Sequence, residues 1–354
     1  MERTFGQPTG NCLVMASARF DVLVVGAGFS GLYMLHRLRQ LGLRTRVLEK
    51  AENVGGTWLF NRYPGARCDI ESIEYSYSFS EEIQQEWVWT ESMPAQPEVE
   101  AYLNFVADRL DLRRDITFDT KVVAMAFDEE AAQWELRTKR GEIYIAPFVV
   151  AASGILSVPL EPDIPGMATF AGTPLFASHW PREGFDLAGR RVGVIGTGST
   201  GVQLIPIVSR EASQLYVFQR SAAYTLPWRV RRFERGELDE IKARYHEIRA
   251  AQRTHPIGAA RLSAFSVLLG MLGKPPLKSA TCDEQLRAQQ EWIDHTTALV
   301  ARTVLVHPTC NSWYNGDNVP GKKRMYMGYV GGIPEYRCRC DEIAAGGYTG
   351  FKLT

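Results

Sequence analysis

Two glycine-rich hexads constrain the fold of this chain more than any other feature. The first, GAGFSG, occupies residues 26–31, and the second, GTGSTG, occupies residues 196–201. Each follows a short apolar run, at residues 20–25 and 191–195, and each precedes apolar residues with helical spacing. In a G-x-G-x-x-G turn the glycines permit a tight bend, close approach of the backbone to a pyrophosphate, and close packing of helix on strand. The order strand, glycine turn, helix therefore predicts two dinucleotide-binding units in one chain. The alternative is a pair of glycine turns that hold no ligand.

The segments around the hexads complete this α/β pattern. Residues 32–43 and 200–209 are expected to be helical, and residues 45–48 and 215–218 to be the second strand of each unit. Further strands are expected at residues 121–127, 134–138 and 143–150, helices at 237–252 and 284–301, and a proline-bearing break at 273–282.

The residue that closes each second strand distinguishes the two ligands. Glu49 stands 21 residues after Gly28, where a carboxylate can accept hydrogen bonds from a ribose 2′-hydroxyl and repels a 2′-phosphate. The first unit is therefore predicted to bind FAD or NAD. In the second unit Arg220 stands 22 residues after Gly198, and a guanidinium suits a 2′-phosphate. NADPH is predicted there, with a solvated surface arginine as the alternative for Arg220.

Composition restricts the partners to small molecules. The 354 residues suffice for two domains or one composite domain, and 40 basic side chains balance 40 acidic ones, so neither nucleic acid nor an anionic membrane is expected. The six cysteines form no C-x-x-C pair and the six histidines are dispersed, so no metal site is expected. Scattered thiols of this kind predict a location in the reducing cytoplasm. The apolar run at 263–273 is too short to cross a bilayer and predicts a buried helix, and the first residues do not have the pattern of a signal peptide.

Longer motifs resemble those of the type I Baeyer-Villiger monooxygenases, a family of class B flavoprotein monooxygenases. Besides the hexads, the matching motifs are VGGTW (54–58), NRYPGARCDIESIEYSYSFS (61–80), ASGILSVP (152–159), FAGTPLFASHWP (170–181), SWYNGDNVPGKKRMYMGYVGG (312–332) and the final CDEIAAGGYTGFKLT. The resemblance implies an oxidoreductase in which NADPH reduces FAD, O2 reacts with the flavin, and one oxygen atom enters a ketone to give an ester or lactone.

The resemblance also implies an architecture: two Rossmann-like domains, with the NADPH domain inserted in the FAD domain. The expected divisions are a leader at 1–19, the FAD domain at 20–160, the NADPH domain with a partial helical segment at 161–282, and a C-terminal segment returning to the FAD domain at 283–354.

Site residues are carried over by position from the same resemblance. FAD is expected to contact Gly26, Gly28, Gly31, Glu49, Gly56, Thr57, Trp58, Asp69 and Tyr75. NADPH is expected to contact Gly196, Gly198, Ser199, Gly201, Arg220 and Trp313. Asp69 is also the catalytic candidate, since it matches the aspartate that pairs with the family's catalytic arginine.

Two departures from the family pattern matter. Phe176 stands where the family fingerprint F-x-G-x-x-x-H-x-x-x-W-P/D has its histidine, and His179 is three residues out of register. A large internal section of the family, which includes its lysine-arginine pair, is missing, so the fold is expected to be incomplete in the middle and its unfinished sheets to favour self-association or instability. The alternative functions are an uncoupled NADPH oxidase that makes hydrogen peroxide and an inactive remnant that only binds nucleotide.

Overall fold

The computed structural model describes residues 18–156, 158–159, 162–219, 230–254, 336–338 and 349–353. By their contacts the residues form two compact units, 1–60 with 99–165 and 61–98 with 166–354. Each unit contains one of the glycine hexads.

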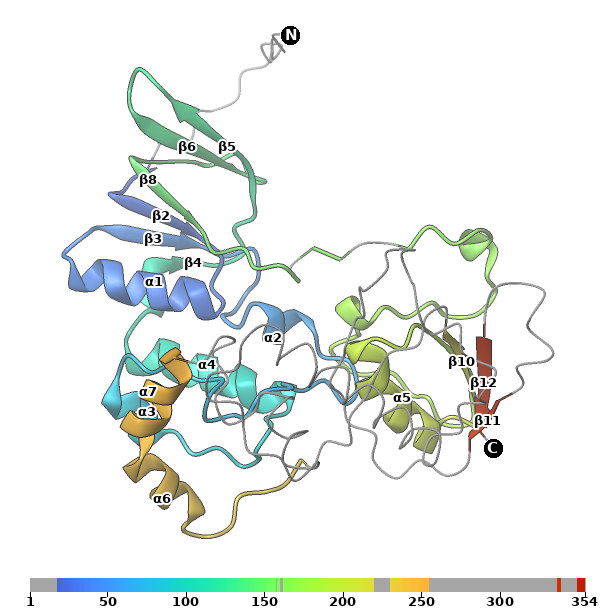
Figure 1. Ribbon diagram of the computed structural model, residues 1–354. Helices are drawn as coiled ribbons and strands as arrows, with labels where there is room; N and C mark the ends of the chain where they lie inside the picture. The colour runs from blue at the N-terminus through green and yellow to red at the C-terminus, as the bar shows by residue number, and fades with distance from the viewer. Residues whose placement is uncertain are drawn as a thin grey trace, which may run out of the picture. The chain divides into compact units, whose positions relative to one another are not determined.

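The first unit is built on a parallel sheet of four strands (Figure 1). Strand β2 (Val22–Val25) leads through the hexad into helix α1 (Phe29–Gln40) and then into β3 (Thr45–Leu48), as the pattern of residues predicts. The sheet order is β4-β3-β2-β8, with β4 at Ile116–Thr117 and β8 at Phe148–Ala151. The first strand therefore lies inside the sheet, as in a doubly wound fold.

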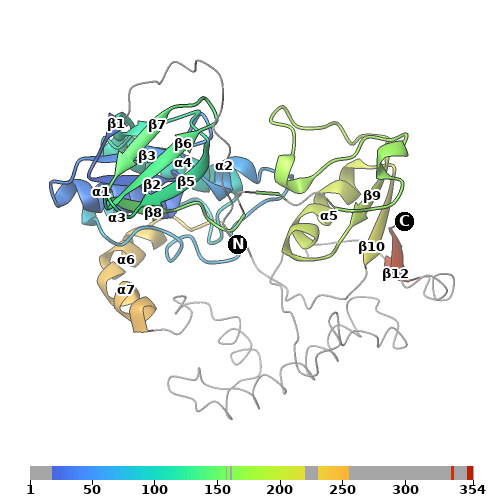
Figure 2. The same cartoon turned by 90° about the horizontal axis from the view of Figure 1, so that it is seen from above.

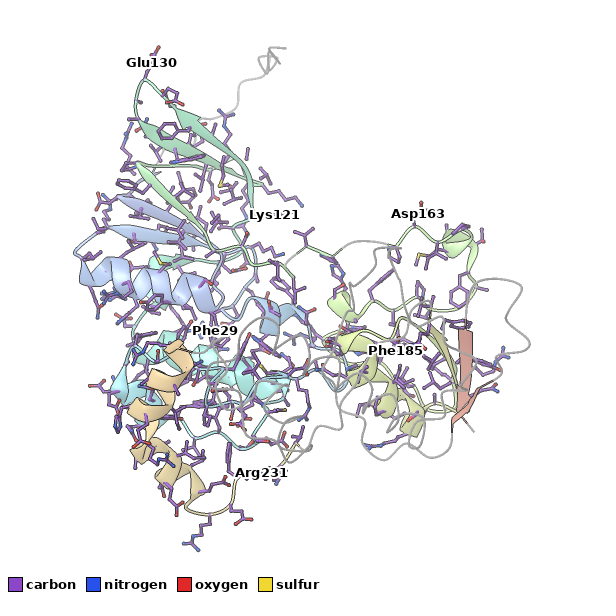
Figure 3. All side chains as sticks on the ribbon, in the orientation of Figure 1. Phe29, Lys121, Glu130, Asp163, Phe185 and Arg231 are labelled. Atoms are coloured by element: carbon purple, nitrogen blue, oxygen red, sulfur yellow. The ribbon has the colours of Figure 1, made fainter. Side chains whose placement is uncertain are left out.

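Both faces of this parallel sheet are covered, as burial of such a sheet requires. On one face α1 buries Leu32, Leu35 and Leu38. On the other face a second sheet, order β1-β7-β6-β5, shares a core with it that contains Leu23 and Leu136 (Figure 1). The strands of this second sheet are β1 (Ala18–Arg19), β5 (Val122–Asp128), β6 (Gln133–Thr138) and β7 (Ile143–Ala146). Glu130 lies at the exposed turn between β5 and β6 (Figure 3).

The prediction of one strand at 143–150 was wrong. The segment forms β7 and β8, which belong to different sheets, and Pro147 separates them. Proline has no backbone N–H to donate to a strand neighbour, so the pairing ends there and the chain changes sheets. The predicted helix at 237–252 is likewise two helices, α6 (Glu237–Ala243) and α7 (Tyr245–Thr254), with Arg244 between them outside helical geometry.

Several short elements and one long helix were not predicted from hydrophobic periodicity. They are α2 (Thr57–Phe60), α3 (Glu81–Glu86), α4 (Gln96–Arg109), η1 (Arg113–Asp115), η2 (Met167–Thr169) and η3 (Ala177–His179). None of the helices in the described part of the chain is long and apolar enough to cross a membrane.

The second unit repeats the strand, turn, helix, strand order. Strand β9 (Arg191–Ile195) leads into α5 (Ser199–Glu211) and then β10 (Gln214–Gln219), which pairs in parallel with β9. Two C-terminal strands, β12 (Thr349–Leu353) and β11 (Tyr336–Cys338), extend the sheet in the order β11-β12-β10-β9. Figure 2 shows α5 lying beside β9 and β10.

The core of the second unit lies between α5 and its sheet. It contains Trp180, Val194, Leu204 and Val217, and Phe185 packs against it (Figure 3). The opposite side of the two strands carries Ile195, Tyr216 and Phe218, which are 71%, 37% and 42% exposed.

The sheet of the second unit, β11-β12-β10-β9, is incomplete among the described residues. Strands β9 and β2 are each the first strand of a strand, glycine turn, helix, strand unit. However, β9 pairs with one described strand, whereas β2 pairs with two. Within the described ranges, β9 is therefore an edge strand, whereas the corresponding strand of a doubly wound fold lies inside its sheet. The segments predicted at 263–273, 273–282 and 284–301 lie outside the described residues.

Candidate dinucleotide sites

The first hexad forms a turn whose glycines are required by close backbone contacts. Gly26 has a φ of +105°, and a Cβ there would lie 2.6 Å from the carbonyl oxygen of Ala152. A Cβ on Gly31 would lie 1.8 Å from the carbonyl oxygen of Gly26. The turn therefore packs against the start of its own helix and the end of β8.

The VGGTW motif runs directly against this turn. A Cβ on Gly56 would lie 2.9 Å from the Cα of Gly28, so the two backbones are in contact. Helix α2 begins at Thr57, immediately after Gly56, and Trp58 is buried. The structure thus brings together Gly26, Gly28, Gly31, Gly56, Thr57 and Trp58 within the first unit.

The N-terminus of α1 has the character of an anion site. Its N-cap is Gly28, no side chain caps it, and its first turn carries no acidic residue. By contrast, α3 is capped by the hydroxyl of Ser80 and begins with two glutamates. Backbone N–H groups and the helix dipole favour a negative group at such an end.

Glu49 lies at the carboxyl end of β3 and is held against the hexad. Its side chain is buried; Oε2 accepts from the N–H of Ala27 at 2.6 Å and Oε1 from the N–H of Ala51 at 2.9 Å. An ionised carboxylate has about four acceptor positions, so both oxygens retain capacity for ribose hydroxyls. Its contact with a ribose stays a prediction.

The second hexad has the same construction. Gly196 has a φ of +101°, Gly198 is the N-cap of α5, and Ser199 is the first residue of the helix. A Cβ on Gly201 would lie 2.3 Å from the carbonyl oxygen of Gly196, matching the first hexad. This helix also lacks a side-chain cap and an acidic first turn.

Gln219 is a further candidate site residue, which was not predicted from the sequence. It is the last residue of β10 and stands 21 residues after Gly198, the same interval that separates Glu49 from Gly28. Its Nε2 donates to the hydroxyl of Thr197 at 2.9 Å, while Glu49 bonds the residue at the same hexad position, Ala27. The two intervals alone would have found it. A neutral amide therefore stands where the first site has a carboxylate.

Four predicted residues either belong to the second unit, apart from the first hexad, or lie outside the described residues. Tyr75 is half-buried and belongs to the second unit, as does Asp69. Arg220 and Trp313 lie outside the described residues.

Asp69 is a half-buried carboxyl with an altered acidity. Burial raises the pKa of Asp69 to about 6, against the opposing effects of a hydrogen bond from Gln203 and the charge of Arg67. The Nε2 of Gln203 donates to Oδ1 of Asp69 at 2.7 Å. The group therefore changes charge close to neutral pH.

The FAGTPLFASHWP stretch divides into a buried and an exposed part. Trp180 is buried in the core of the second unit, while Phe170 is 63% exposed with its ring against Gly172. Phe176 is half-buried and precedes η3, and His179 is exposed at the end of that turn.

Comparisons with known proteins decide the family. The family model described as flavin-binding monooxygenase-like matches residues 19–237. This chain belongs to that family. Acetone monooxygenase (methyl acetate-forming) of Gordonia sp. (strain TY-5) is 43% identical over 235 residues, which are 66% of this chain and 44% of that protein. Cyclohexanone 1,2-monooxygenase of Acinetobacter sp. is 41% identical over 227 residues, 64% of this chain and 42% of that protein.

Solved structures agree with this placement. An oxidized steroid monooxygenase bound to NADP has a TM-score of 0.74 at 41% identity, covering 88% of this chain and 62% of that chain. The open crystal structure of cyclohexanone monooxygenase has a TM-score of 0.77 at 34% identity, covering 88% and 64%. The resemblance to Baeyer-Villiger monooxygenases and the fold of two Rossmann-like domains are confirmed. The chain spans less than half the length of these curated relatives, which agrees with the predicted missing section.

Proposed function

We propose that this member of the flavin-binding monooxygenase-like family binds FAD at the first hexad and NADPH at the second and performs a Baeyer-Villiger oxidation. The substrates are a ketone and O2, and the product is an ester or lactone. The observation that carries the proposal is the difference between two otherwise matching turns: Glu49 bonds one hexad and Gln219 the other. A carboxylate selects against a 2′-phosphate, and a neutral amide permits it.

Each cofactor is assigned the residues expected from the family resemblance, of which Arg220 and Trp313 lie outside the described residues. FAD would be held by Gly26, Gly28, Gly31, Glu49, Gly56, Thr57, Trp58, Asp69 and Tyr75. NADPH would be held by Gly196, Gly198, Ser199, Gly201, Arg220 and Trp313. When bound, the flavin supplies the redox chemistry: hydride acceptance and reaction with O2.

The protein's own residues would orient the two cofactors and set the charge beside them. The uncapped first turns of α1 and α5 would supply backbone N–H groups to the pyrophosphates of the two cofactors, and the glycines at Gly28 and Gly56 would leave no side chain in the way of FAD. Asp69 is proposed as the catalytic residue: its carboxyl, with a pKa of about 6, holds or releases a proton near neutral pH and so sets the charge at its site.

A second candidate function is an uncoupled NADPH oxidase that releases hydrogen peroxide. It is favoured by Phe176 at the histidine position of the fingerprint, since a phenyl ring neither donates nor accepts the hydrogen bond of an imidazole. An inactive nucleotide-binding remnant is the third.

One experiment separates these functions. The full chain is loaded with FAD and titrated anaerobically with NADPH or NADH, then mixed with air and either acetone or cyclohexanone. The proposal expects bleaching by NADPH in preference to NADH and a ketone-dependent fall in peroxide together with ester or lactone. Peroxide equal to NADPH consumed, whatever the ketone, would establish the oxidase, and failure to retain FAD would refute both.

We also propose that the protein is cytoplasmic and that it self-associates. A cytoplasmic location follows from the thiols: no C-x-x-C pair occurs in the sequence, and Cys68 is a buried, unbridged cysteine whose pKa burial raises to about 12. Self-association follows from the sheet of the second unit. Among the described residues its strand β9 pairs on one side, and Ile195 and Phe218 are exposed. Light scattering of the purified chain that gives a monomer mass would refute self-association.

A further inference from the structure

Gln203 lies on α5, two residues after the second hexad, and its side chain is buried with both ends of the amide in use. Nε2 donates to Oδ1 of Asp69 at 2.7 Å and to the carbonyl oxygen of Arg67 at 3.1 Å. Oε1 accepts from the hydroxyl of Tyr63 at 2.8 Å and from the N–H of Arg67 at 3.3 Å. These bonds fix the amide in one orientation, because a flipped amide would set its oxygen against the Asp69 carboxylate and the Arg67 carbonyl and its NH2 group against the Arg67 N–H.

The network begins on the helix that follows the glycine turn. Hydrogen bonds run from Tyr63 through Gln203 to Asp69, and Gln203 lies in the first turns of α5. The path therefore connects the start of α5 with a residue 134 positions earlier in the chain. The side chain of Thr200, in the hexad itself, opposes the effect of burial, which raises the pKa of the Tyr63 phenol.

Close backbone packing holds this segment against α5. A Cβ on Gly65 would lie 2.5 Å from the carbonyl oxygen of Gln203, so the segment that carries Tyr63 and Asp69 lies directly on α5. Because Gln203 bonds Asp69 directly, a displacement of the start of α5 would change the hydrogen bonding of the Asp69 carboxyl.

We propose that Gln203 is a positioning residue, which fixes the orientation and ionisation of Asp69 and couples them to occupation of the glycine turn at the start of α5. The first part depends only on this chain. The coupling rests on the proposed function, in which NADPH occupies that turn.

The electrostatic surroundings of Asp69 support this role. The charge of Arg67 and the hydrogen bond from Gln203 both favour the carboxylate, while burial opposes it. Among the described residues, the Tyr63 phenol and the Cys68 thiol are titratable groups whose pKa the charge of Asp69 raises. A hydrogen bond to a carboxylate is worth more than one between neutral groups, and its loss leaves burial opposed by Arg67 alone.

The test is a carboxyl-carbon NMR titration of the full chain labelled in aspartate, with the Asp69 signal assigned by Asp69→Asn. Gln203→Met preserves side-chain length and removes all four bonds; it is expected to raise the pKa of Asp69 by about 1. Val202→Ala is the matched control: Val202 is the adjacent buried residue of α5 and has no hydrogen-bonding side chain, so it is expected to lower stability and leave this pKa unchanged. An unchanged pKa in Gln203→Met would overturn the proposal.

A milder variant covers failure of Gln203→Met to fold. Tyr63→Phe removes one hydroxyl from the path and is expected to raise the same pKa by a smaller amount; no change in this variant would also overturn the proposal.

NADP+ is then added to the wild-type chain, with binding measured by calorimetry. Binding with an unmoved Asp69 pKa would refute the coupling, whereas absence of binding would refute the proposed NADPH site and leave the titration result standing.

Discussion

Gly31→Ala offers the sharpest test of the first turn, because local and tertiary arguments predict opposite signs. In the interior of an ordinary helix, replacing glycine by alanine stabilises by about 0.5–1 kcal/mol. Here the new Cβ would lie 1.8 Å from the carbonyl oxygen of Gly26, whereas real Cβ atoms essentially never approach a heavy atom within 3.0 Å.

The clash cannot be relieved by a side chain. The obstructing atom belongs to the backbone of Gly26, whose own N–H donates to the carbonyl oxygen of Leu48 at 2.9 Å, so relief requires moving α1 or the turn. Overpacking of a core costs about 1–3 kcal/mol even where neighbours can adjust. We therefore expect a net loss of about 3 kcal/mol, which corresponds to a thermal midpoint lower by roughly 6–12 °C for a domain of this size.

Urea unfolding and thermal melting, followed by circular dichroism, measure this loss. Ser30→Ala is the control: it adds alanine to the same turn of α1 at an exposed position and should remain within about 0.5 kcal/mol of the wild type. Gly31→Ala unfolding at the same or higher urea concentration would refute the geometry of the turn.

Three further outcomes test the sites. Glu49→Gln should destabilise the chain by about 1–3 kcal/mol and weaken FAD binding, since an amide NH2 group would face the N–H of Ala27 or Ala51. Urea unfolding measures the stability and flavin titration measures the FAD affinity, and unchanged values would contradict the role of the carboxylate. Gln219→Glu should weaken NADPH at least about tenfold relative to NADH, because it restores a carboxylate that repels the 2′-phosphate; an unchanged ratio in competitive titrations would show that this position does not select the nucleotide. Burial raises the pKa of Asp69 from 3.8 to about 6, so folding favours the protonated form, and stability should fall on the order of 2 kcal/mol as pH rises from about 4 to 7. Asp69→Asn should remove this component from the pH dependence of the melting midpoint, and an identical profile would contradict the shifted pKa.

Local sequence determined the two nucleotide-binding cores. Apolar runs that end at glycine hexads predicted β2, α1, β3 and β9, α5, β10 with bounds within a few residues of those observed. Local sequence also predicted Glu49 as the ribose contact at the end of the second strand, because the interval from the hexad to that point is set by the length of the helix between them. These features are local: each depends on residues close together in the chain.

Only the tertiary structure decided the pairings between distant segments. Pro147 divides one apolar run between two sheets, an outcome that depends on which neighbours receive the strands. The bonds from Gln203 to Asp69 and from Gln219 to Thr197 join residues 134 and 22 positions apart. Hydrophobic periodicity records which face of an element is buried and carries no information about its partner, so these contacts, and the acidity of Asp69 that follows from them, become visible only when the chain is folded.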